Sequence, residues 1–199
     1  MRSVIEGGDV RFERLLSQVK KHLLQRSNTY ISTMLDYFRI DPNWPGRKGV
    51  NNKLARGISL KALDRIDLLE QAMLKEIGDH FPNYAQRFIP YISLHEFEAL
   101  LFSEPSILAE KCHINLDSVQ EIVKIYKTPE DINDSPEGAP SKRLSKLKPQ
   151  FRSKPAMAQS VTEAIGIERI RKECPHFHMW LCKLEALDSL DDKKQNPVF

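Results

Sequence analysis

The sequence has few cysteines, no long apolar run and little net charge, and each of these absences excludes a class of protein. Three cysteines in 199 residues are too few, and odd in number, for a disulfide framework. No apolar run approaches the roughly 20 residues of a membrane span, and the first residues, MRSVIEGGDVRFERLL, lack the apolar core of a signal peptide. We therefore expect a cytoplasmic protein without a membrane partner.

Signatures of nucleotide binding and of serine hydrolysis are also missing. The chain contains no P-loop, no G-x-S-x-G nucleophile elbow and no dinucleotide-binding fingerprint. The net charge of +3 is too small to indicate a partner, but it is unevenly distributed. The segment 136–154, PEGAPSKRLSKLKPQFRSK, has six basic residues and one acid, which exceeds the surplus of the whole chain. This segment either binds a polyanion or forms a solvated surface.

The hydrophobic pattern predicts alternating strands and helices in the first half of the chain. RSVI, NTYISTMLDYF and RFIPYIS are typical of strands, and Pro90 makes the last one an edge strand or a strand with a break. Apolar spacing predicts a helix from Phe12 to Leu23 and another, of about 20 residues, that carries Leu63 and Ile77. Between these helices, DPNWPGRKGVNNKLARG is expected to be a long loop.

The remainder of the chain is predicted to contain helices and loops, with helices at 94–102, near 106–111, and at 117–126, 140–147, 156–165 and 175–188. Alternating strands and helices followed by helices alone predict an α/β fold with a short, mainly parallel sheet and a helical C-terminal half. We expect one domain over residues 1–199. Its parts are a sheet-bearing core, a helical part and a frayed tail, at 1–105, 106–190 and 191–199.

The stretch YISLHEFEALLF, residues 91–102, places His95, Glu96 and Glu98 where a predicted strand gives way to a helix. One interpretation is structural. Ser93 and Glu96 have the spacing of a capping box, and His95 and Glu98 have the spacing of a solvated pair. On this interpretation the acids stabilise a helix start and do no chemistry.

The other interpretation is a metal site. Asp36 lies near the end of the preceding predicted strand, and ligands bind at the C-terminal ends of neighbouring parallel strands. Carboxylates gathered there repel one another unless a hard cation lies between them, and Mg²⁺ binds through carboxylates, phosphate oxygens and water. Asp36, Glu96 and Glu98 are therefore candidate Mg²⁺ ligands and catalytic residues, with His95 as a further candidate. The candidate phosphate contacts in the basic segment are Lys142, Arg143 and Lys146.

Several segments resemble, in order and over nearly the whole chain, a bacterial family catalogued as domain of unknown function 4276: TMLDYF, WPG, RFIPYISLHEFEALLFSEP, PEDINDSPEGAPSKRL and IRKECPHFHMWLCKLEAL. That family is grouped with the Toprim-like domains, compact Rossmann-like α/β units that bind Mg²⁺ through acidic residues in topoisomerases, primases and nucleases. The resemblance implies phosphodiester chemistry on nucleic acid, and it suggests an ATPase partner in phage defence.

The resemblance also implies roles for single residues. Asp36 in TMLDYF corresponds to the strand-end aspartate, and Glu96 and Glu98 in EFEALLF supply further acids. Lys142 and Arg143 in APSKRL correspond to the basic motif of the family.

The N-terminus departs from the Toprim pattern. Toprim domains begin with a strand that ends in a glutamate, in a pattern like V-E-G-x-T-E, and VIEGGD offers Glu6. Only 30 positions separate Glu6 from Asp36, which leaves room for one helix where two βα units are needed. We therefore expect the chain to lack one strand, one helix and one metal ligand at its N-terminus.

A cluster of potential metal ligands near the C-terminus has the pattern C-x-H-x-H-x3-C, formed by Cys174, His176, His178 and Cys182. Zinc uses these residue types, but the spacing matches no standard zinc finger. Pro175 favours a packed helix that begins there, so we expect buried cysteines and a helix-start histidine. His176 lies in the CPHF segment of the family resemblance and is a further candidate without an assigned role.

Three functions are compatible with the sequence. The first is Mg²⁺-dependent nuclease or other phosphodiester chemistry on nucleic acid. The second is a non-catalytic module that binds nucleic acid or a protein such as an ATPase, and that is catalytically incomplete without the N-terminal glutamate segment. The third is an enzyme that acts on a small phosphorylated molecule.

Overall fold

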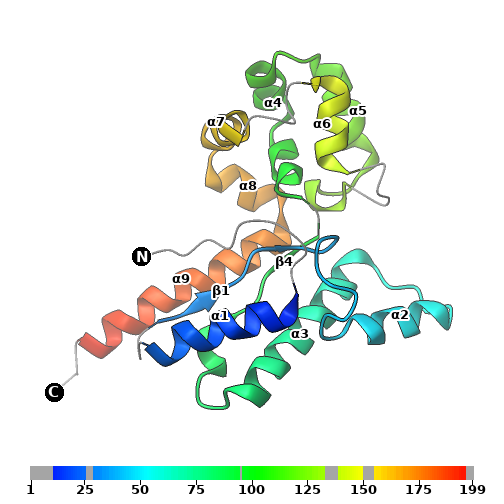
Figure 1. Ribbon diagram of the computed structural model, residues 1–199. Helices are drawn as coiled ribbons and strands as arrows, with labels where there is room; N and C mark the ends of the chain where they lie inside the picture. The colour runs from blue at the N-terminus through cyan, green and yellow to red at the C-terminus, as the bar shows by residue number, and fades with distance from the viewer. Residues whose placement is uncertain (1–10, 26–28, 95, 133–138, 150–154, 196–199) are drawn as a thin grey trace. The chain divides into compact units, whose positions relative to one another are not determined.

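The computed structural model describes residues 11–25, 29–94, 96–132, 139–149 and 155–195 (Figure 1). The chain divides into two compact units, residues 1–94 and 95–199, and each is described by itself. The expected strand RSVI and Glu6 lie outside the described residues. The expectation of one domain over the whole chain remains a prediction.

The first unit contains the strands and the helices that cover them (Figure 1). Its elements are α1 (Phe12–Gln25), β1 (Ile31–Ser32), β2 (Leu35–Asp36), α2 (Arg47–Ala55), α3 (Ala62–His80), the 3-10 helix η1 (Ala85–Arg87), β3 (Phe88–Ile89) and β4 (Ile92–Ser93).

The strands pair in parallel, as the sequence predicts. β1 pairs with β3, and β2 pairs with β4, with Asp36 opposite Ser93 in the second pair. Both pairs belong to the same two chain segments, because backbone hydrogen bonds continue between them from Thr33 N to Ile89 O and from Leu35 N to Tyr91 O. The two short ladders are therefore one interrupted strand pair.

Pro90 marks the interruption, as its missing N–H predicts. The side chain of Thr33 fills the gap. Its hydroxyl accepts a hydrogen bond from Tyr91 N at 3.0 Å and donates one to Tyr91 O at 3.2 Å. A buried hydroxyl thus replaces the regular ladder beside the proline, and the backbone polar groups there stay satisfied.

Two buried charged side chains also act as hydrogen-bond partners for backbone groups around the strand pair. Glu70 of α3 accepts a hydrogen bond from Ile92 N at 2.7 Å. Arg87 donates to Leu23 O near the end of α1 at 2.9 Å and to Thr29 O at 3.2 Å. Both side chains are buried, so each supplies a partner to backbone groups that water does not reach.

The apolar faces of α1 and α3 form the core of this unit, as their spacing predicts. The fully enclosed members of the core include Val19 and Leu23 from α1, Ile66, Leu69, Met73 and Ile77 from α3, and Ile92 from β4.

The segment expected to be a long loop contains a helix that the sequence analysis missed. α2 begins after Gly46, which has a φ of +83°. Trp44 is buried and makes an edge contact with Phe12, with ring centroids 5.2 Å apart. The WPG segment thus anchors this connection in the core. Glycine and asparagine are weak helix formers, which is why composition predicted a loop.

The second unit is helical, apart from its connections. It contains η2 (Phe97–Ser103), α4 (Pro105–Cys112), α5 (Leu116–Ile125), η3 (Pro129–Asp131), α6 (Pro140–Leu147), α7 (Pro155–Ile165), α8 (Ile167–Glu173) and α9 (Pro175–Gln195).

Three predictions for this unit need correction. The expected helix at 94–102 is the 3-10 helix η2, whose residues from Ala99 to Ser103 are all buried. The sequence analysis missed α8. α9 continues to Gln195, so residues 191–195 of the expected frayed tail are helical. The other expected helices agree with the structure to within one or two residues.

The fold class is confirmed: the protein is α/β, with short parallel strands in the first half and a helical second half. The Toprim-like assignment remains a prediction. In the described part of the chain, no helix combines the length and apolar character that a membrane crossing requires.

Gly46→Ala should destabilise the first unit. A Cβ at this position would lie 2.9 Å from Ala72 Cβ and 3.1 Å from Leu68 O, and the left-handed backbone adds strain. We expect a loss of at least about 1–2 kcal/mol in the free energy of unfolding, measured by urea denaturation. Gly49→Ala, three residues later in α2, is the control. Nothing lies within 4 Å of its Cβ position, so this variant should gain about 0.5–1 kcal/mol. Equal effects of the two substitutions would contradict this account of Gly46.

Candidate functional site

Asp36 ends strand β2 and closes a turn. Its Oδ1 accepts a hydrogen bond from Phe38 N at 2.9 Å, and its Oδ2 lies 3.7 Å from Arg39 Nε. The side chain is 16% exposed, whereas that of Arg39 is 61% exposed. Asp36 therefore lies at the strand end where the sequence analysis placed it, and one of its oxygens is bound to the turn that follows.

The expected capping box would make Ser93 the N-cap of a helix, whereas Glu96 is the N-cap in the structure. It occupies the N-cap position of η2 without a side-chain cap on that helix. Its Oε2 instead accepts a hydrogen bond from Ser141 N at 3.0 Å. Because Pro140 has no N–H, the amide of Ser141 is the first that α6 offers. A carboxylate at this point satisfies an unpaired amide and complements the helix dipole.

This contact brings a candidate metal ligand next to the candidate phosphate contacts. Ser141 directly precedes Lys142 and Arg143 on α6. Glu96 and the basic helix are 45 positions apart in the sequence, and the hydrogen bond from Ser141 N joins them within the second unit. Glu98 lies on η2, two residues beyond Glu96, and is partly buried.

The three basic candidates differ in their surroundings. Lys142 is partly buried and Lys146 is exposed. The guanidinium of Arg143 donates a hydrogen bond to Tyr126 Oη and lies over the Tyr126 ring, 5.3 Å from its centroid. Tyr126 therefore holds Arg143 in place, while Lys146 extends from the same helix into solvent.

The metal site itself remains a prediction. Asp36 belongs to the first unit, and Glu96 and Glu98 belong to the second. His95 lies outside the described residues. Within the described ranges, no group of three or more His, Cys, Asp or Glu side chains is placed to hold a metal ion.

A buried carboxylate that the sequence analysis missed supports the start of α9. Glu130 of η3 is 5% exposed, and its two oxygens accept hydrogen bonds from His176 N and Phe177 N, both at 2.9 Å. Burial raises the pKa of Glu130, and the two amide hydrogen bonds oppose that rise. The expected helix start at Pro175 is confirmed. The backbone amides of His176 and Phe177, in the CPHF segment, bond this helix start to Glu130.

Burial makes two of the three cysteines unreactive. Cys174 is fully buried, and its Sγ lies 3.4 Å from Ser103 Oγ. Burial raises the pKa of Cys174 to about 12 and also raises the pKa of Cys112. Since the thiolate is the nucleophile, neither residue is a candidate for covalent catalysis at neutral pH.

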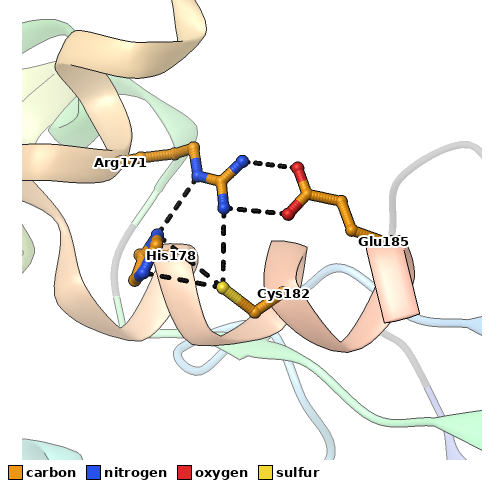
Figure 2. A network of polar contacts seen from close by, with 4 residues as sticks. All are labelled: Arg171, His178, Cys182 and Glu185. Atoms are coloured by element: carbon orange, nitrogen blue, oxygen red, sulfur yellow. Dashed lines mark hydrogen bonds and ion pairs between the residues drawn. The ribbon is translucent and has the colours of Figure 1, made fainter. Parts of the chain in front are cut away.

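The C-x-H-x-H-x3-C pattern divides between the interior and the surface. Cys174 is buried, as expected, but Cys182 is exposed, contrary to the expectation of buried cysteines. His176 lies at the start of α9, as expected, and is also buried. His178 and Cys182 lie beside Arg171 and Glu185 on the surface of α8 and α9 (Figure 2). The spacing of i and i+4 in the sequence predicts that His178 and Cys182 share a helix face, and the structure confirms it.

Comparison with known proteins matches the chain to a family model. The family model described as Domain of unknown function (DUF4276) matches residues 1–185. No curated protein matches the chain, and no solved structure matches it. The match covers every candidate residue named above, and its description states no activity.

Glu130→Gln should remove one component of the pH dependence of stability. Because the pKa of Glu130 is raised in the folded state, the folded protein holds a proton that the unfolded chain has already released. Stability from this group is therefore present below the ordinary carboxyl range and is lost as pH rises through the raised pKa. The difference in unfolding free energy between wild type and Glu130→Gln should fall across that window, measured by denaturant titration at each pH.

The control for this measurement is Glu110→Gln, an exposed acid on α4. Its difference from wild type should show no comparable fall. A pH-independent difference between wild type and Glu130→Gln would contradict the effect attributed to burial of Glu130.

Proposed function

Because the chain belongs to the DUF4276 family, whose description names no activity, we propose a function from its own residues: Mg²⁺-dependent phosphodiester chemistry on nucleic acid. The observation that carries the proposal is the hydrogen bond from Ser141 N to Glu96, which joins a candidate ligand to the start of the basic helix α6. Mg²⁺-dependent phosphodiester chemistry uses carboxylates that bind the metal ion together with cationic groups that contact phosphate.

The position of Asp36 gives further support. Asp36 pairs with Ser93 at the end of the strand pair, and Glu96 follows Ser93 by three positions. The end of a parallel strand is the place where ligands bind in α/β sheets.

The residue types fit a Mg²⁺ site. Asp36, Glu96 and Glu98 offer the hard oxygen ligands that Mg²⁺ prefers. When bound, the ion supplies charge neutralisation at phosphorus and orients the attacking water.

The basic residues of α6 have distinct roles in this proposal. Arg143, positioned by Tyr126, offers a planar fork to a phosphate group, whereas Lys142 and Lys146 act as point charges. An ATPase partner and a role in phage defence rest on the family resemblance alone and are part of the proposal only to that extent.

The second candidate function is a non-catalytic module that binds nucleic acid or a partner protein. It is favoured by the hydrogen bonds of the acids themselves. Asp36 accepts from Phe38 N and Glu96 accepts from Ser141 N, which are the roles of turn and helix caps. On this alternative the carboxylates hold the backbone and the basic helix binds the partner.

Asp36→Asn should abolish most Mg²⁺-dependent cleavage of DNA or RNA. Asparagine keeps an oxygen that can accept from Phe38 N, so the turn survives while the charged ligand is lost. We expect a fall in rate of about a hundredfold or more, because a metal ion contributes several kcal/mol to the transition state. Glu96→Gln follows the same design, since glutamine can still accept from Ser141 N.

Asp67→Asn, an exposed acid on α3, controls for the change in net charge and should leave cleavage unchanged. Full activity in both Asp36→Asn and Glu96→Gln would remove these residues from the mechanism. Absence of Mg²⁺ binding in isothermal titration, together with retained nucleic-acid binding, would favour the non-catalytic module.

Lys146→Gln should weaken nucleic-acid binding in a salt-dependent way. A lysine that contacts phosphate releases about one counterion, so the slope of log K against log salt should become shallower by about 1. The measurement is fluorescence anisotropy with a labelled oligonucleotide over a salt series. Lys124→Gln, an exposed lysine on α5, is the matched control, and an equal change in its slope would argue against a specific role for α6.

A further inference from the structure

Helix α2 is a second basic segment, and the proposed function does not use it. The stretch from residue 46 to residue 57, GRKGVNNKLARG, contains four basic residues and no acid. It belongs to the first unit, which also carries Asp36, whereas α6 belongs to the second unit. A phosphate contact at α2 would therefore lie in the unit that holds the strand-end aspartate.

The basic side chains of α2 include two on the side of the helix that faces away from the core. Val50 is the buried residue of α2, whereas Lys48, Asn52 and Arg56 are exposed. These three residues are four positions apart, so they follow one side of the helix, and Lys48 and Arg56 are about 12 Å apart along its axis. Exposed cations in a row, with no acid among them, attract a polyanion.

The turn that follows β2 carries aromatic side chains. Phe38 is 48% exposed, so part of its ring is accessible to a ligand. Tyr37 supports it through an edge contact, with ring centroids 5.2 Å apart. Phe38 N also donates a hydrogen bond to Asp36 Oδ1, and Arg39, with its side chain 61% exposed, lies in the same turn. An exposed ring and an exposed cation thus flank the candidate ligand Asp36 in the chain.

Arg47 joins this turn to α2. Its guanidinium lies over the Tyr37 ring, 4.5 Å from the centroid, and its Nη2 donates a hydrogen bond to Tyr37 O at 3.3 Å. Arg47 is the first residue of α2 and directly precedes Lys48. The contact therefore holds the aromatic turn against the start of the basic helix, and rings and cations belong to one surface.

We propose that the turn 36–39 and α2 form a binding surface for single-stranded nucleic acid, on which one base stacks on Phe38 and the phosphates contact the cations of α2. Stacking on aromatic side chains beside a row of cations is the usual way in which proteins bind single strands. Within a duplex, neighbouring base pairs cover the face of each base, so this surface favours an unpaired strand. The inference rests on the proposed function, because it names the form of nucleic acid that the site takes.

The test is the binding of labelled oligonucleotides to the full chain by fluorescence anisotropy, with a metal chelator present so that no cleavage occurs. The probes are a thymidine single strand of about 12 nucleotides and a mixed-sequence duplex of the same length. We expect the single strand to bind more tightly. Phe38→Ala should weaken its binding about five- to a hundredfold, which corresponds to the loss of one stacked base, and should leave duplex binding nearly unchanged.

Three further variants separate stacking from a structural effect. Phe38→Leu keeps an apolar side chain against Tyr37 but has no aromatic face, so it should weaken single-strand binding as Phe38→Ala does. Phe38→Tyr keeps the ring and should bind like wild type. Leu74→Ala removes a side chain of α3 that is 39% exposed, and it should also bind like wild type. Circular dichroism checks that each variant is folded.

The role of α2 is tested by the salt dependence of single-strand binding. Lys48→Gln should make the slope of log K against log salt shallower by about 0.7, the value for one phosphate contact to a single strand. Lys20→Gln, an exposed lysine on α1, is the matched control and should keep the wild-type slope. Equal slopes for wild type and Lys48→Gln would remove α2 from the surface.

The proposal is overturned if the single strand binds no more tightly than the duplex, if neither oligonucleotide binds, or if Phe38→Leu binds the single strand like wild type. It is also overturned if Leu74→Ala weakens binding as much as Phe38→Ala. Its failure is distinct from that of the proposed catalysis. Single-strand binding that depends on Phe38, without any cleavage, supports this surface and contradicts the catalysis, whereas cleavage that Asp36→Asn abolishes, without a preference for single strands, does the reverse.

Discussion

Hydrogen bonds from backbone amides to carboxylates support both units of this protein. In the first unit, Glu70 accepts from Ile92 N beside the strand pair. In the second, Glu96 accepts from Ser141 N at the start of α6, and Glu130 accepts from two amides at the start of α9. Both helices begin with a proline, and each receives its acid from a distant 3-10 segment. A buried amide without a partner costs about 1–3 kcal/mol, so these acids stabilise the fold whatever else they do.

This constraint also bears on function, because a carboxylate can cap a helix and bind a cation at once. Glu96 shows the point most clearly. Its contact with Ser141 N gives it a structural role, and the same contact places it beside Lys142 and Arg143. Substitution of an acid by its amide separates capping from cation binding, because the side chain keeps an oxygen acceptor and loses its negative charge.

The spacing of apolar residues predicted the helices that bury only one face. It did not predict the helix type where every side of a segment is buried, and it missed a helix whose composition is typical of loops. The helices at α1 and α3 were predicted because apolar residues recur on one side of each. The run from Ala99 to Ser103 is buried on all sides, so its pattern did not distinguish a 3-10 from an α-helix. α2 was missed because glycines such as Gly46 and Gly49 are typical of loops. Gly46 is needed because a side chain at this position would collide with α3.

The sequence alone determined the fold class, the strand break at Pro90, the helix start at Pro175 and the family, because each depends on residues that are near one another in the chain or on motif order. Only the tertiary structure decided which group satisfies each buried amide. Glu130 lies 46 and 47 positions before the amides of His176 and Phe177 that it caps, and no local pattern specifies such a pairing. Likewise, packing of α8 against α9 brings Arg171 into contact with His178, Cys182 and Glu185, which lie 7, 11 and 14 positions further along the chain.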